Sequence, residues 1–112
     1  MAEEPALDRI DPASAARAQA AAAASQGRYA QAFATLSPYI SPSASGELVV
    51  EAVRYAYAAE QWRDVIRIAD ARLASPSPSD TAQQRATLFD LRARAQALQA
   101  PIPVDEASSI DP

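Results

Sequence analysis

The chain has 112 residues, a formal net charge of −4, and neither cysteine nor histidine. This composition excludes disulfides, thiol catalysis, histidine-dependent triads and most zinc sites. An acidic chain also lacks the basic face that nucleic-acid phosphates require. The hydrophobic fraction of 49% consists largely of Ala, which is the best helix former but buries little area. We therefore expect an all-α fold with few large side chains in its core.

The first expected helix begins at Asp11-Pro12, because Asp is a preferred N-cap and Pro fits the first helical position. Its run from Ala13 to Ser25 is almost pure Ala. Gly27 then predicts a tight turn, since a residue without Cβ adopts a positive φ at little cost. A second helix is expected from Tyr29 to Ser37, where Pro38 stops it.

Three more helices are expected further along the chain. Those over 46–59 and 62–74 are indicated by apolar residues that recur at helical spacing. Asp80 and Gln83 match a capping box that opens a last helix, which runs to about Gln99. Short turns within the first two pairs of helices predict two antiparallel hairpins.

The expected domain organisation follows from these elements. Residues 1–10 form a flexible N-terminal segment, residues 11–100 the helical domain, and residues 101–112 a flexible C-terminal tail. No segment is apolar enough to span a bilayer, and the acidic N-terminus is not typical of a signal peptide. We expect a cytoplasmic protein, with a periplasmic fragment of a longer protein as the alternative.

An internal repeat relates the two expected hairpins. An aromatic residue follows the turn in each, and from Tyr29 to Trp62 is 33 positions. Gly27, Tyr29 and Ala32 have the spacing of the tetratricopeptide hallmark, which is a turn glycine, an aromatic and then a small residue. In the second unit Glu60 stands at the glycine position. The chain resembles the bacterial tetratricopeptide repeat (TPR-like) family over roughly residues 13–100.

The resemblance implies a TPR-like α-solenoid of two helix hairpins plus a C-terminal capping helix. In this family the first helices of the pairs line a concave groove, which holds a peptide or helix of another protein. Transferred by position, the resemblance assigns three residues of the first and last helices to partner binding: Arg17, Asp90 and Arg94.

The helix expected over 46–59 carries a pattern of its own. Four residues recur at i, i+3, i+7 and i+10, to one side of the apolar arc: Glu47, Val50, Arg54 and Tyr57. Arg pairs a carboxylate bidentately and Tyr provides rigid contact area, so the stripe predicts a grip on an extended peptide or on the end of a helix. The alternative is an ordinary solvated helix face, with Arg54 in intrahelical ion pairs. Asp90 and Arg94 likewise have the spacing of a surface pair.

We expect a non-enzymatic protein–protein interaction module, an adaptor or scaffold. The acidic residues are dispersed, so no catalytic residue, metal site or cofactor is predicted. One alternative is a small cytoplasmic chaperone for a secretion-system or assembly subunit. Another is a self-assembling structural protein joined through the Ala-rich face of the first helix. A homo-oligomer and a place in a longer repeat array are both compatible with the sequence.

Overall fold

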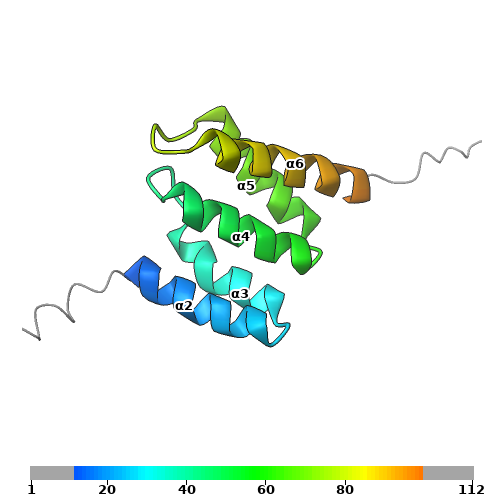
Figure 1. The fold of residues 1–112 in the computed structure, drawn as a ribbon. Helices are drawn as coiled ribbons and strands as arrows, with labels where there is room; N and C mark the ends of the chain where they lie inside the picture. The colour runs from blue at the N-terminus through cyan, green and yellow to red at the C-terminus, as the bar shows by residue number, and fades with distance from the viewer. Residues whose placement is uncertain (1–11, 100–112) are drawn as a thin grey trace, which may run out of the picture.

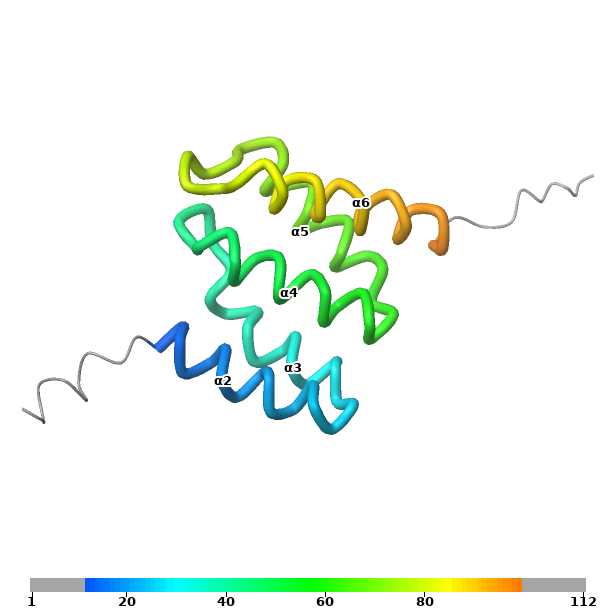
Figure 2. Tube along the Cα trace, in the orientation of Figure 1, coloured from blue at the N-terminus to red at the C-terminus, as the bar shows by residue number. Residues whose placement is uncertain are grey.

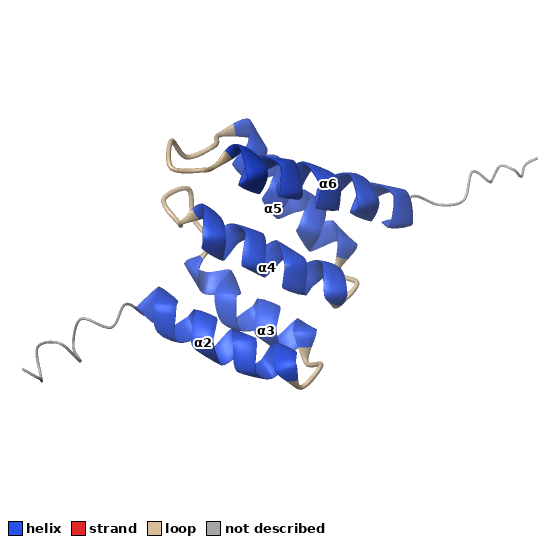
Figure 3. Cartoon of the chain, in the orientation of Figure 1, coloured by secondary structure: helices blue, strands red, loops and turns tan. Residues whose placement is uncertain are grey.

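A computed structural model describes residues 12–99, and this part of the chain is all-helical, with no strand (Figure 3). The elements in chain order are α2 (Pro12–Ser25), α3 (Tyr29–Leu36), the 3-10 turn η1 (Ser37–Tyr39), α4 (Gly46–Ala58), α5 (Trp62–Ala74) and α6 (Ala82–Gln99). The helix bounds predicted from the sequence are confirmed to within a residue or two. The predicted cap at Asp11 and the two predicted flexible segments lie outside the described residues.

The helices form two layers. Each helix packs against the next one in the chain, and α4 also packs against α6. In Figure 1, α2, α4 and α6 lie side by side in front, and α3 and α5 lie behind them. The tube in Figure 2 shows the two tight turns, one between α2 and α3 and the other between α4 and α5. The arrangement therefore brings one side of α2, α4 and α6 onto a common face.

The two tight turns have the same backbone geometry. Gly27 has φ 78° and Glu60 has φ 63°, so both adopt the left-handed conformation. In each turn the amide of the following residue donates to the carbonyl five positions earlier, at 2.9 Å, which is the Schellman way of ending a helix. Glu60 thus occupies the same position in its turn as Gly27, but its side chain makes the left-handed conformation unfavourable.

The core is unevenly built. Its largest fully buried side chains belong to α3, α4, α5 and α6: Leu36, Val49, Val53, Val65 and Leu88. Helix α2 contributes three small side chains to the core: Ala16, Ala20 and Ala23. Because stabilisation scales with the apolar area buried, α2 is held less strongly than the helices that follow it.

The capping box that opens α6 lies one residue later than predicted. The amide of Gln84 donates to Thr81 Oγ1 at 3.0 Å, and the amide of Thr81 donates to Gln84 Oε1 at 2.9 Å. The predicted box of Asp80 and Gln83 is therefore wrong. Asp80 is 7% exposed and binds an arginine of α5 instead. Because its carboxylate is buried there, Thr81 and not Asp80 caps α6.

A buried ion pair fixes the loops at one end of the helices. Arg72 of α5 binds Asp80 bidentately, with both nitrogen–oxygen distances at 2.8 Å. Its guanidinium also donates to the carbonyls of Ser41, Pro42 and Ala44 at 3.3, 3.3 and 2.6 Å. We call this group the Arg72 clamp. Since it joins the segment before α4 to the segment before α6, it sets how these two helices lie on the common face.

The start of α4 touches the clamp closely. Gly46 is buried at the first position of α4, and a Cβ there would collide with Gln84 Oε1 and lie 2.7 Å from Asp80 Oδ1. The hydrogen bonds from Arg72 hold the pKa of Asp80 below its usual range, despite its burial. The carboxylate therefore stays ionised in a space that only glycine leaves free.

Candidate partner-binding face

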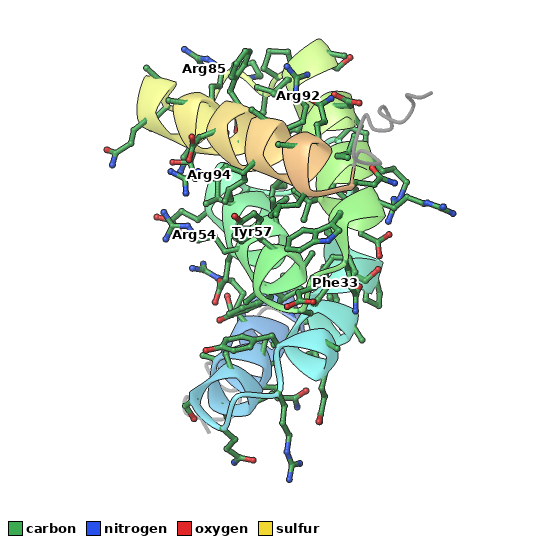
Figure 4. The ribbon with its side chains drawn as sticks, turned by 90° about the vertical axis from the view of Figure 1, so that its right-hand side faces the viewer. Phe33, Arg54, Tyr57, Arg85, Arg92 and Arg94 are labelled. Atoms are coloured by element: carbon green, nitrogen blue, oxygen red, sulfur yellow. The ribbon has the colours of Figure 1, made fainter. Side chains whose placement is uncertain are left out.

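The candidate site is the exposed side of α2, α4 and α6. Six charged residues define it, and we call it the α2/α4/α6 face: Arg17, Glu47, Glu51, Arg54, Asp90 and Arg94. Figure 4 shows Arg54 and Arg94 projecting on the same side from neighbouring helices. Side chains spaced three or four apart lie on one face of a helix, so each helix contributes its residues without any irregular backbone.

The α2 edge of this face is a network of internal pairs. Arg17 Nε donates to Glu51 Oε1 at 2.8 Å, and Arg17 Nη1 lies 3.4 Å from Glu47 Oε1. The hydroxyl of Tyr55 donates to the other oxygen of Glu51 at 2.8 Å. Burial, and then this bond to Glu51, raises the pKa of Tyr55 to about 12. The charge of Arg17 is therefore already matched within the chain.

The α6 edge is also paired. Arg94 Nε lies 2.9 Å from Asp90 Oδ2, one helical turn away, as the spacing predicts. The carboxylate of Asp90 is the main cause that raises the pKa of Arg94, and the hydroxyl of Tyr57 contributes to it. Tyr57 is half-buried and meets the ring of Trp62 edge-on, with 5.2 Å between centroids. Tyr57 thus forms a rigid aromatic surface between α4 and α6.

Arg54 differs from its neighbours on the face. Its side chain is exposed, and it forms no ion pair with any residue in the range 12–99. The intrahelical pairing considered as the alternative for Arg54 is therefore not observed. Val50 does not join the face, because it is only 9% exposed and packs in the core. The centre of the face is therefore a guanidinium without an ion-pair partner among residues 12–99, between an α2 edge with one arginine for two carboxylates and a balanced α6 edge.

No metal-binding constellation accompanies these residues. Within the described part of the chain, no group of three or more His, Cys, Asp or Glu side chains lies close enough to hold an ion. A cleft of about 510 Å³ lies elsewhere, between the segment before α4 and helix α5, and Ile40, Val49 and Ile68 line it. The carbonyls of Ser41 and Pro42 at its edge already accept hydrogen bonds from the Arg72 clamp. Arg67 also lines the cleft, but it pairs with Asp64 at 2.9 Å, so the polar groups at the cleft already have partners within the chain.

Sequence reasoning missed two groups of residues that shape the site. Glu51 lies 34 positions after Arg17, which is close to one repeat length. The two residues therefore occupy equivalent positions in successive repeats, and the repeat could have predicted that they pair. The bond between Arg72 and Asp80 has no comparable signal, because both residues fit ordinary surface positions in the sequence pattern. The pair becomes apparent only from the positions of the segments before α4 and α6 in space.

Comparison with known proteins gave no match among protein-family models, curated proteins or solved structures. The family resemblance therefore depends on the repeat residues of this chain alone. None of the helices between residues 12 and 99 is long and apolar enough to cross a membrane.

Proposed function

We propose that this chain is a non-enzymatic, TPR-like protein–protein interaction module that binds a partner peptide or helix end on the α2/α4/α6 face. A carboxylate of the partner would pair with Arg54. The observation that carries the proposal is the exposed guanidinium of Arg54, which has no ion-pair partner among residues 12–99 and is flanked by Arg17 and Arg94, which are both paired. A planar guanidinium binds a carboxylate through two parallel hydrogen bonds.

The surroundings of Arg54 favour a short, directional contact. Because Arg17 and Arg94 are already paired with carboxylates, an incoming carboxylate meets in Arg54 the one arginine of the face without an ion-pair partner among residues 12–99, instead of a diffuse basic patch. Tyr57 beside it is already half-buried against Trp62, so little side-chain entropy is lost when a partner packs on it. An exposed ion pair contributes only about 0.2–1 kcal/mol by itself. Contact with Tyr57 must therefore supply much of the affinity, while Arg54 selects the partner.

The test begins with peptides selected from a display library by the wild-type chain. Isothermal titration then gives the dissociation constant of one selected peptide for Arg54→Glu and for a control, Arg63→Glu. Arg63 is also exposed, but it lies on α5, in the other layer. We expect Arg54→Glu to weaken binding about tenfold or more, which is about 1.4 kcal/mol. Arg63→Glu should change the constant less than about twofold, on the order of 0.4 kcal/mol.

Equal weakening by the two variants would mean that net charge, and not the face, determines binding. No selected peptide at all would contradict the interaction module in this form. Sedimentation of the free chain at increasing concentration accompanies the titration. A size that grows with concentration would favour the self-assembling alternative.

A further inference from the structure

The outer side of α6 carries a groove that nothing in the described chain covers. Its floor is a stripe of one helical face, formed by Ala82, Ala86, Phe89 and Ala93. With Leu73, Arg85 and Asp90 these residues line an open groove of about 560 Å³, which we call the α6 groove. Phe89 at its centre is 58% exposed, which is unusual for the largest apolar side chain of a helix.

The register of the helices shows what kind of position this is. Ser45 caps α4 and Thr81 caps α6. When the two caps are aligned, Phe89 corresponds to Val53, which is fully buried in the core. The α6 groove therefore has the position of a surface that packs in the core. The corresponding surface of α4 is covered, whereas nothing in the described chain covers this surface of α6.

One border of the groove carries two arginines, Arg85 and Arg92, and the groove lining also includes Asp90. Arg92 lies over the ring of Phe89, with its guanidinium carbon 4.8 Å from the centroid, and pairs with Asp70 at 2.8 Å. The Nε atom of Arg92 is buried and has no hydrogen-bond partner in the described part of the chain. Figure 4 shows Arg85 and Arg92 together on the side of α6 away from α4.

Asp70 matches the charge of Arg92, and Arg94 matches that of Asp90. Arg85, in contrast, forms no ion pair among residues 12–99 and donates to the carbonyl of Asp80 at 2.9 Å. An occupant should therefore be mainly apolar, with a carboxylate that reaches Arg85.

We propose that residues 100–112 of the same chain cover the α6 groove. This segment starts directly after α6 and is acidic, with no basic residue. It contains three branched apolar residues and three carboxylates: Ile102, Val104, Ile110, Asp105, Glu106 and Asp111. An apolar side chain would pack on Phe89, and a carboxylate would face Arg85.

The segment is long enough for this path. Pro101 and Pro103 disfavour a continued helix and favour extended backbone, which covers about 3.1 Å per residue. Residues 100–112 then span about 40 Å, whereas the 18 residues of α6 span about 27 Å. Even after a reversal of direction, the segment reaches Phe89. Because the contact is within one chain, a weak interaction is enough to populate it.

A second copy of the chain fits the groove less well. Two α6 helices packed antiparallel about a two-fold axis bring the same flank of each helix together. The flank of α6 that carries Arg85 would then face itself, and like charges across an interface oppose association. The acidic segment avoids this repulsion.

The absence of cysteine allows a clean test on the full chain. Ser108→Cys accepts one nitroxide spin label, and amide peak intensities are compared before and after its reduction. We expect selective loss of intensity at Leu73, Phe89 and Ala93 before reduction. A mixed sample, in which labelled chains carry no nitrogen-15 and enriched chains carry no label, should show no such loss.

Two matched variants identify the contact. Phe89→Ala in the labelled chain should restore the lost intensity, whereas Leu98→Ala should not. Leu98 is a comparable control, because it is 54% exposed on the same helix and lies outside the groove. Circular dichroism checks that both variants fold.

Four results would overturn the proposal. One is loss of intensity around Arg54 and Tyr57 instead, which would place the segment on the α2/α4/α6 face. The others are no selective loss, an equal loss in the mixed sample, and a loss that survives Phe89→Ala. Peptide binding at Arg54 is measured separately, so failure there leaves this result unaffected.

Discussion

Replacing Asp80 by Asn tests the Arg72 clamp. The substitution keeps the size of the side chain but removes the charge opposite Arg72, and both side chains are almost fully buried, at 4% and 1% exposed. Removing one partner of such a pair leaves an uncompensated buried charge and costs about 3–5 kcal/mol. The free energy of unfolding of a domain of this size is about 5–15 kcal/mol. The variant should therefore lose a large part of its stability.

Urea denaturation at neutral pH, followed by far-ultraviolet circular dichroism, gives the free energy of unfolding. The matched control is Asp70→Asn, which breaks the partly exposed pair with Arg92 and should cost less than about 1 kcal/mol. A loss below about 1 kcal/mol for Asp80→Asn would refute the role assigned to the clamp. The double variant Arg72→Met/Asp80→Leu should be more stable than Asp80→Asn, because it leaves no buried charge behind.

The clamp also predicts a dependence on pH. The hydrogen bonds from Arg72 are the main cause that lowers the pKa of Asp80 in the folded chain. The stability that this carboxylate contributes is thus complete above its unfolded pKa of about 4 and is lost as the pH falls through the lower folded value. In wild type, the free energy of unfolding should drop in this acidic range. In Asp80→Asn the drop should be smaller, and an equal drop would contradict the assignment.

Three further substitutions test individual features by the same denaturation assay. Gly27→Ala should cost about 1–2 kcal/mol because of its left-handed φ. Glu60→Gly should stabilise by less than about 1 kcal/mol, since strain relief is offset by chain entropy; destabilisation would contradict this account of the turn. Gly46→Ala should destabilise by about 1–3 kcal/mol through overpacking, although Ala is the better helix former. An ultraviolet titration should find the pKa of Tyr55 at about 12, with stability declining between pH 10 and that value. Glu51→Gln should lower this pKa only in part, because burial is its larger cause.

The helices could be predicted because their signals are local. Proline clusters end them, and helical spacing of apolar residues marks their buried sides. The start of α6 shows where local signals fail, because Asp80 with Gln83 and Thr81 with Gln84 offer two capping boxes one residue apart. Only the placement of α5 shows that Asp80 is buried against Arg72, so its carboxylate is no longer free to cap the helix.

The candidate face was predictable in part for the same reason. The stripe on α4 identifies Arg54 and Tyr57, since both lie on one helix at regular spacing. Val50 belongs to that stripe as well, but it is buried in the core, which spacing along one helix does not reveal. The pairing of Arg17 with Glu51 depends on how α2 and α4 lie beside each other, which spacing within one helix does not reveal.

The Ala-only packing of α2 has a consequence for the charge of the face. Separating α2 from the rest exposes little apolar area, so local opening of this helix needs much less free energy than global unfolding. Its amides should exchange with solvent deuterium sooner than those of α4 and α5. Each opening withdraws Arg17 from Glu47 and Glu51, so the α2 edge of the face alternates between a form in which one guanidinium pairs with both carboxylates and a form in which both carboxylates are unmatched.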